Sequence, residues 1–233
     1  METLERDVAG NGSTKPLVIF GTGSIARMAH FLFTHDSPLK VAAFTVDRAR
    51  MDAERFLGLP VTAFEEIRET HPPEAFDLFV AVGYRRVNTF RAERFRQAKE
   101  MGYRLPTYIS SRASTWPGLE IGENCLVLDL VVIHPFARLG DDTILWSGSH
   151  IGHDSVIGDH CYIASRAVVA GFVTVESNCF LGSNSTIRDG VTVARECVIG
   201  AGAVVTKDTR ERQVYAAARS RLLPISSDRL PNL

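Results

Sequence analysis

The chain has 233 residues, of which 45% are hydrophobic, and its formal net charge is −1 at pH 7. This length can bury one large core or two modest ones, and we expect two domains. The balanced charge excludes the basic surface that nucleic acid or an anionic membrane would require. No apolar run is long enough to cross a bilayer, and the first residues lack the apolar core of a signal peptide, so we expect a cytoplasmic location.

Residues 1–15 are polar and show no periodic apolar pattern, so we expect a flexible tail there. Over residues 16–108, apolar strands alternate with segments of helical apolar spacing, which predicts a small parallel sheet in a Rossmann-like α/β domain. The expected strands cover Leu17–Phe20, Val41–Val46 and residues 78–82, and the expected helices cover residues 24–33 and 87–101.

The sequence GTGS at positions 21–24 lies between the first expected strand and the first expected helix. A glycine turn at a helix N-terminus can hold a phosphate group through backbone N–H groups. The third glycine of the dinucleotide fingerprint is absent, and a tight turn that merely joins strand to helix explains the motif equally well.

Downstream, an aliphatic residue recurs at every sixth position without a miss. The fifteen residues are Ile121, Val127, Ile133, Leu139, Leu145, Ile151, Ile157, Ile163, Val169, Val175, Leu181, Ile187, Val193, Ile199 and Val205. The following residue is often glycine or alanine, and a small or β-branched residue often stands four positions after the aliphatic. This hexapeptide signature predicts a parallel β-helix over residues 109–208, with three hexads in each triangular coil.

Residues separated by three hexads should stack on adjacent coils of such a helix. Cys125, Cys161, Cys179 and Cys197 all occupy the small inward position of their hexads, with Thr143 in the one gap of the column. We therefore expect four buried free thiols that fill the core. A disulfide framework or a zinc site would need paired spacing, which the cysteines lack.

The repeat resembles that of bacterial acyltransferases, and IGAGAVVTKD at residues 199–208 is typical of how their helices end. This resemblance, and not the spacing, implies a left-handed coil. An α/β domain followed by the repeat resembles the nucleotide-sugar N-acetyltransferases and sialic-acid O-acetyltransferases over roughly residues 16–223. The tail predicted for residues 209–233 contains VYAAARSRLLP, which departs from the family's VYxGxPA at Ala217 and Arg219, so contacts to the adenine end of a cofactor differ.

The resemblance implies that the α/β domain binds a nucleotide diphosphate sugar. The implied substrate-binding residues are Gly21, Thr22, Gly23, Ser24, Asp47, Gly83, Tyr84 and Arg85. Asp47 is expected near the base or ribose, and Arg85 is suited to pairing with a phosphate.

The motif SHIGHDSVIGD resembles the family's catalytic motif, which implies that His153 is the general base and Asp154 the carboxylate that orients it. An imidazole suits the removal of a proton as the acceptor attacks a thioester. Gly171 stands three hexads later, and the family uses the backbone N–H of the matching glycine for the thioester oxygen. A solvated corner histidine is the competing interpretation for His153, and the preferred one for His134 and His160.

His150 is predicted either to contact substrate, to support His153 or to have no role. Tyr162 is expected in the substrate site, where the family's sugar N-acetyltransferases have a second histidine. The resemblance further implies acetyl-CoA as co-substrate, no metal, and a homotrimer of closed symmetry whose subunit grooves hold the cofactor. The implied cofactor-binding residues are Gly171, Gly182, Ser183, Gly200, Ala201 and Lys207.

We therefore expect an acetyl-CoA-dependent N-acetyltransferase that acts on a nucleotide-linked amino sugar in lipopolysaccharide O-antigen biosynthesis. O-acetylation of a sugar hydroxyl uses the same base and differs only in the acceptor. A zinc-dependent carbonic anhydrase of the same fold would need paired histidines five positions apart, and the four histidines of the predicted β-helix, His134, His150, His153 and His160, lack that spacing. A non-catalytic scaffold would give no thermal shift with acetyl-CoA, whereas a ligand that binds only the folded state must stabilise it.

Overall fold

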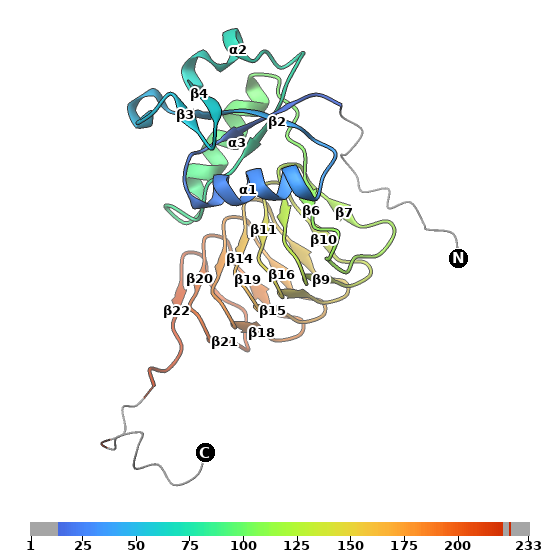
Figure 1. The fold of residues 1–233 in the computed structure, drawn as a ribbon. Helices are drawn as coiled ribbons and strands as arrows, with labels where there is room; N and C mark the ends of the chain where they lie inside the picture. Colours follow the sequence, from blue (N-terminus) through green and yellow to red (C-terminus); the bar gives the residue numbers. More distant parts are fainter. Residues whose placement is uncertain (1–13, 221–223, 225–233) are drawn as a thin grey trace.

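The computed structural model describes residues 14–220 and residue 224 and consists of an α/β layer resting on a triangular prism of short strands (Figure 1). The flexible tail expected at residues 1–15 lies outside the described residues except for Thr14 and Lys15. The Nζ of Lys15 donates a hydrogen bond to the backbone oxygen of Pro73. No helix in the described ranges is long and apolar enough to cross a membrane.

The α/β layer contains a five-stranded sheet with the order β3-β4-β2-β1-β5. Its strands are β1 (Leu17–Phe20), β2 (Val41–Val46), β3 (Arg55–Phe56), β4 (Leu59–Ala63) and β5 (Asp77–Val80). Its helical segments are α1 (Ser24–His35), η1 (Arg48–Arg50), η2 (Phe64–Glu66), α2 (Ile67–Thr70) and α3 (Thr89–Glu100). Strands β4, β2, β1 and β5 run parallel, as the alternating pattern predicts.

The sequence analysis did not predict β3 and β4. They form an antiparallel hairpin at the sheet edge, with Arg55 opposite Pro60. Proline lacks an N–H, so Pro60 makes a strand hard to predict from the sequence, although proline is tolerated at a sheet edge. The parallel pairing of β4 with β2 begins at Val61, one residue later, where the donors are intact.

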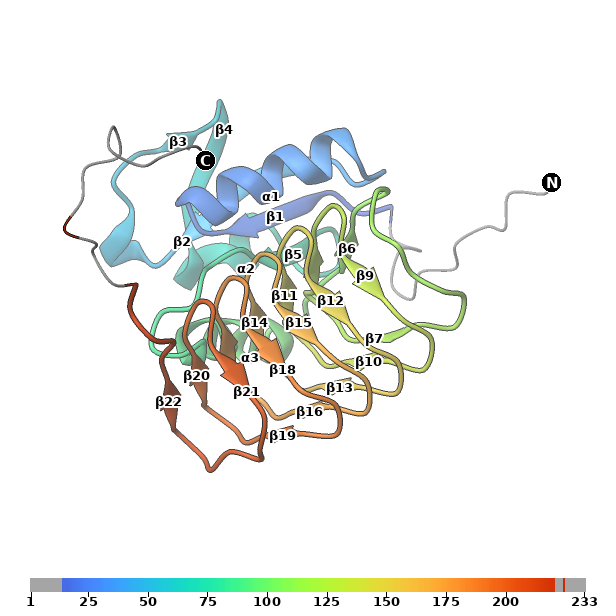
Figure 2. The same cartoon turned by 90° about the horizontal axis from the view of Figure 1, so that it is seen from below.

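The prism is the left-handed parallel β-helix, and its two-residue strands form three faces. The covered face lies against the α/β layer and contains β6 (Tyr108–Ile109), β8 (Leu126–Val127), β11 (Ile144–Leu145), β14 (Tyr162–Ile163), β17 (Phe180–Leu181), β20 (Val198–Ile199) and β22 (Val214–Tyr215). The second face contains β9 (Val132–Ile133), β12 (His150–Ile151), β15 (Val168–Val169), β18 (Thr186–Ile187) and β21 (Val204–Val205). The third face contains β7 (Glu120–Ile121), β10 (Arg138–Leu139), β13 (Val156–Ile157), β16 (Thr174–Val175) and β19 (Thr192–Val193) (Figure 2).

The stacking predicted from the three-hexad period is confirmed. Each strand pairs in parallel with the strand three hexads away, for example Ile151 with Val169. The aliphatic ladder from Val127 to Val205 is buried, and Ile121 in the first coil is partly buried. The covered face continues past residue 208, because β22 pairs with β20 and adds part of another coil.

The cysteine column is also confirmed. All four cysteines are free and fully buried, as is Thr143 in the gap. Burial raises the pKa of the Cys125 thiol to about 12, so it is held in the neutral form at neutral pH.

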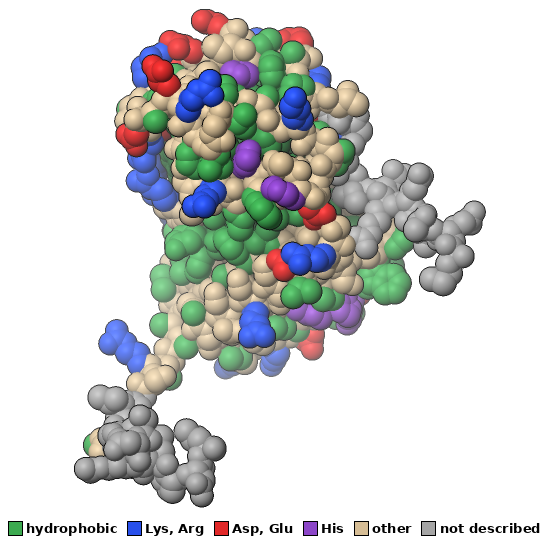
Figure 3. Space-filling model, viewed as in Figure 1, with side chains coloured by type: hydrophobic (Ala, Val, Ile, Leu, Met, Phe, Trp, Pro, Cys, Tyr) green, Lys and Arg blue, Asp and Glu red, His purple; other side chains and the backbone are tan. Residues whose placement is uncertain are grey.

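A buried polar network fixes the α/β layer to the β-helix. Arg91 of α3 and Asp142 of the β-helix are both fully buried, with their Nε and Oδ2 atoms 3.0 Å apart. Arg91 also donates to the backbone oxygens of His160 and Cys161, and the His160 ring donates from Nδ1 to Asp142. Apolar side chains surround this junction, and Figure 3 shows them as a band between the two layers.

We predict that Arg91→Ala destabilises the protein by about 3–5 kcal/mol, because it leaves the Asp142 carboxylate buried without its cation. The midpoint of chemical denaturation measures the loss. Arg96→Ala, which removes an exposed arginine from the same helix, is the matched control. Equal midpoints for the two variants would contradict this account of the junction.

Candidate functional site

His153 lies at the corner between the second and third faces, where the chain turns from β12 to β13. The next residue, Asp154, has a left-handed backbone with φ of 56°, which aspartate tolerates better than most residues. The His153 Nδ1 lies 2.9 Å from Asp154 Oδ2, and both side chains are about half exposed. Because a carboxylate only accepts, Nδ1 carries the proton, and Nε2 of the neutral ring has the free lone pair.

Gly171 lies one coil from His153, as the stacking rule predicts. A Cβ added at Gly171 would lie 2.8 Å from His153 Nε2, so only glycine leaves room for the ring as it stands. The edge of the Phe172 ring also contacts the imidazole, with centroids 4.9 Å apart. The side chain of His153 therefore packs against Gly171 and the exposed Phe172 ring, which both belong to the next coil.

The backbone N–H of Gly171 donates to Asp189 Oδ1 at 2.7 Å. The sequence analysis expects this N–H to meet a thioester oxygen, and in this structure it is already paired with a carboxylate. Asp189 was not identified from the sequence, although it stands three hexads after Gly171. The same stacking rule, extended by one coil, would have found it.

The residues expected to bind the cofactor lie at two corners of the prism. Gly182, Ser183, Gly200 and Ala201 follow β17 and β20, at the corner between the covered and second faces. Lys207 stands three hexads after Asp189, at the corner of His153. A Cβ at Gly182 would lie 2.5 Å from the backbone nitrogen of Ala201, so coil stacking by itself requires this glycine.

The second face lies between these two corners and is uncharged. Its outward positions are Val132, His150, Val168, Thr186 and Val204. His150 thus lies on this face, with its ring 4.8 Å from the ring of His134. A cavity of about 410 Å³ adjoins the His153 corner and is lined by His134, Asp154 and the exposed rings of Trp116 and Phe136, among others.

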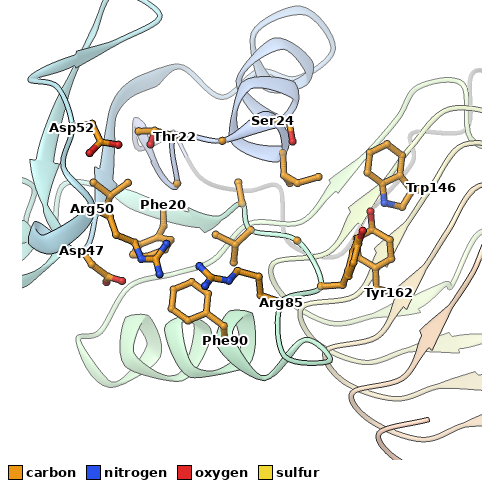
Figure 4. Close-up of a pocket in the computed structure, with 18 residues that line it drawn as sticks. Phe20, Thr22, Ser24, Asp47, Arg50, Asp52, Arg85, Phe90, Trp146 and Tyr162 are labelled. Carbon is orange, nitrogen blue, oxygen red and sulfur yellow. The ribbon is translucent and has the colours of Figure 1, made fainter. Parts of the chain in front are cut away.

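A larger cavity, of about 690 Å³, opens on the other side of the molecule, at the carboxyl ends of β1, β2 and β5 (Figure 4). It brings together all the residues predicted to bind the nucleotide sugar except His150. These are Gly21, Thr22, Gly23, Ser24, Asp47, Gly83, Tyr84, Arg85 and Tyr162.

The glycine turn lies at the middle of this cavity. Gly21 has φ of 118°, and a Cβ there would lie 2.9 Å from the backbone oxygen of Ala81. Gly23 caps α1 without any side-chain hydrogen bond, and no acidic residue stands in the first turn. The first N–H groups of α1 are therefore available to an anion.

Cations line one side of the cavity. The guanidinium groups of Arg50 and Arg85 lie 5.9 and 5.8 Å from the centre of the Phe90 ring, and neither forms an ion pair within the described ranges. Asp47 is held by Arg94, with Oδ1 and Nη2 2.9 Å apart. Sequence analysis identified Arg85 but missed Arg50 and Phe90, because no motif marks them.

Aromatic rings form the end of the cavity nearest the β-helix. The Tyr162 ring stacks on Phe180, and Tyr84 meets Tyr162 edge-on with centroids 5.0 Å apart. Trp146, which follows β11 on the coil before that of Tyr162, lines the same end of the cavity. Burial raises the pKa of Tyr162 to about 12, so its hydroxyl is neutral and can donate a hydrogen bond.

One chain does not bring the cavity and His153 together. Tyr162 and Trp146 belong to the covered face, whereas His153 lies at the corner opposite that face. His160 belongs to the buried network of Arg91 instead of either site. No group of three or more histidine, cysteine, aspartate or glutamate side chains that could hold a metal occurs among residues 14–220.

Two family models match the β-helix. The model described as bacterial transferase hexapeptide (six repeats) matches residues 136–171, and the one described as hexapeptide repeat of succinyl-transferase matches residues 172–207. Among curated proteins, an acyl-(acyl-carrier-protein)–UDP-N-acetylglucosamine O-acyltransferase from Pseudomonas fluorescens is 37% identical over 65 residues. The match covers 25% of this chain and 25% of that relative, so it spans only a quarter of the relative's length.

Solved structures match most of the chain. A mutant of perosamine N-acetyltransferase from Caulobacter crescentus, in complex with CoA and GDP-perosamine, is 26% identical with a TM-score of 0.78, covering 87% of this chain and 93% of that chain. The acetyltransferase domain of PglB from Neisseria gonorrhoeae, in complex with acetyl coenzyme A, is 24% identical with a TM-score of 0.76, covering 87% of this chain and 96% of that chain. At 24% identity, the likeness to the PglB domain supports only the shared fold.

We predict that the pKa of His150 lies below its ordinary value of 6.5, because burial disfavours the imidazolium and the neighbouring His134 adds repulsion. His134→Gln should raise the pKa of His150 but leave it below 6.5, since burial persists. Titration of the ring signals by NMR measures both values. A pKa of His150 that is above 6.5, or insensitive to His134→Gln, would be inconsistent with the geometry of this face.

Proposed function

We propose that the chain, whose repeats match hexapeptide transferase models over residues 136–207, transfers an acetyl group from acetyl-CoA to the amino group of a nucleotide-linked amino sugar. The observation that carries this proposal is the His153 corner, where an imidazole with a free Nε2 lies beneath a backbone amide on the next coil. The perosamine N-acetyltransferase of known structure, which binds CoA and a GDP-linked sugar, supports the choice of substrates.

In the proposed reaction, His153 Nε2 accepts the proton that the acceptor nitrogen loses as it attacks the thioester carbonyl. Asp154 holds the Nδ1 proton and stabilises the imidazolium that forms. This attack forms the carbon–nitrogen bond and places negative charge on the carbonyl oxygen. The carbonyl then re-forms as the carbon–sulfur bond breaks, and the proton passes from His153 to the departing thiolate of coenzyme A. The cavity beside Asp154 gives the acceptor room to approach this corner.

The Gly171 N–H is the proposed donor to the thioester oxygen, where negative charge develops. Asp189 has to release this N–H before the oxygen can take its place. An exposed aspartate at a corner can rotate into solvent with little cost, since only one hydrogen bond to it is exchanged. Lys207, on the next coil of the same corner, is proposed to meet a phosphate of the cofactor.

We further propose that a second copy of the chain completes the site. The nucleotide cavity lies on the covered face, whereas His153 lies at the opposite corner, so one chain cannot present both to one substrate. The uncharged second face, bearing Val132, Val168 and Val204, is suited to contact between copies. The corners with the expected cofactor residues border this face, which supports a trimer with the cofactor between subunits.

A sugar hydroxyl is the second candidate acceptor, because the curated relatives that match the repeats are O-acyltransferases. An assay with acetyl-CoA and a panel of nucleotide-linked amino and hydroxy sugars tests both. Release of free thiol measures turnover, and mass spectrometry identifies the acetylated product. No product from any amino or hydroxy sugar would contradict the proposal.

We predict that His153→Ala lowers kcat by about 10²- to 10⁴-fold, the usual contribution of a general base. Thiol release under saturating acetyl-CoA measures the loss. His35→Ala, at an exposed histidine on α1, is the control and should leave kcat unchanged. Full activity of the His153 variant would remove this residue from the mechanism.

Gly171→Ala is predicted to lower kcat by about 10-fold or more, because the new Cβ would displace the His153 ring from its position and small misplacements of reacting groups are costly. The backbone of Gly171 does not lie in the left-handed region, so the variant should fold. Ser177→Ala places alanine at the equivalent hexad position on another corner and is the matched control. Equal kcat values for the two variants would show that Gly171 does not constrain His153.

A further inference from the structure

The 690 Å³ cavity has two ends of different chemistry, with the glycine turn between them. Figure 4 shows Trp146 and Tyr162 at one end and Asp47, Arg50 and Asp52 at the other. The order of the sheet explains this arrangement, because β2 and β5 lie on opposite sides of β1. A diphosphate at the turn would therefore direct its nucleoside toward one end and its sugar toward the other.

The nucleoside belongs at the end formed by β2. In open α/β sheets an acidic residue that follows the second strand binds the ribose hydroxyls. Asp47 follows β2 directly and takes this position, with Arg94 holding its carboxylate. The cations Arg50 and Arg85 lie over Phe90 in the lining of the cavity, where they would face a diphosphate bound at the turn. The base would then lie beyond Asp47, against the segment that follows η1.

Asp52 is the carboxylate at that outer position. It lines the cavity and is exposed to it, and it makes no hydrogen bond or ion pair with any residue in the described part of the chain. It thus differs from Asp47, whose carboxylate is already held by a cation. A carboxylate without a protein partner in a binding cavity offers two acceptor oxygens to a ligand.

The two acceptors of a carboxylate fit the donors of one common base. Guanine presents N1–H and N2–H side by side, so a carboxylate can accept both hydrogen bonds. Uracil and thymine present a single N–H between two carbonyl oxygens, which a carboxylate repels, and adenine presents an acceptor at N1. We propose that Asp52 recognises guanine and makes the cavity selective for a guanosine diphosphate-linked sugar, an inference that rests on the proposed function.

Binding of GDP, inosine diphosphate, UDP and dTDP to the full chain, measured by isothermal titration calorimetry, tests the inference. Inosine diphosphate lacks the 2-amino group and keeps N1–H, so it removes one of the two donors. The wild-type protein should bind GDP at least about 10-fold more tightly than UDP or dTDP, with inosine diphosphate between them. This order follows from counting the donors that face Asp52.

Asp52→Asn should weaken GDP binding by about 10-fold or more without weakening UDP or dTDP binding, because asparagine removes the carboxylate charge and replaces one acceptor by a donor. Glu54→Gln, which neutralises an exposed acid of the same segment outside the cavity, is the matched control. Equal weakening of all four nucleotides by Asp52→Asn would overturn the inference and indicate a contact to ribose. Tighter binding of UDP or dTDP than of GDP would also overturn it.

These outcomes are distinguishable from failure of the proposed function. If the protein binds nucleoside diphosphates without discrimination between bases, the assignment of Asp52 is wrong and the nucleotide-sugar site remains. If it binds none of the four, both the nucleotide site and the base selectivity are overturned.

Discussion

The stacking of successive coils, each three hexads from the next along the chain, is the constraint on which the rest of the structure depends. It packs the aliphatic ladder into one continuous core and requires glycine wherever the next coil comes close, as at Gly182. It also fixes the neighbours of each corner residue. His153, Gly171 and Asp189 meet because they occupy successive coils of one corner, so the proposed catalytic geometry is a direct result of the repeat.

The second requirement is a fixed relation between the two layers. The cavity of about 690 Å³ takes its glycine turn from the α/β layer and its aromatic end from the covered face, so it exists only while the layers stay docked. The Arg91–Asp142 pair secures the docking from inside the junction. A buried ion pair is a directional contact, so it fixes one position of the α/β layer on the β-helix. Apolar side chains between the layers would allow many such positions.

His153 and the large cavity lie on different sides of the prism, so one chain does not form the whole proposed active site. A lone chain presents His153 to one region of solvent and the cavity of about 690 Å³ to another. Under the proposed function, assembly brings the cavity of one copy to the base of the next, and the thioester meets a complete site only at the contact. Under the same proposed function, Asp189 also has to release the Gly171 N–H before that group can meet the thioester.

The sequence by itself determined the β-helix, its register and the pairing of His153 with Gly171, because a strict period converts sequence distance into spatial distance. It also indicated the strands β1 and β2, whose apolar runs are short and buried. Only the tertiary structure decided the parts without a period: the hairpin of β3 and β4, the Arg91 network, the partner of Asp47 and the free carboxylate of Asp52. These contacts join residues at irregular separations, and the docking of packed layers, not local pattern, selects them.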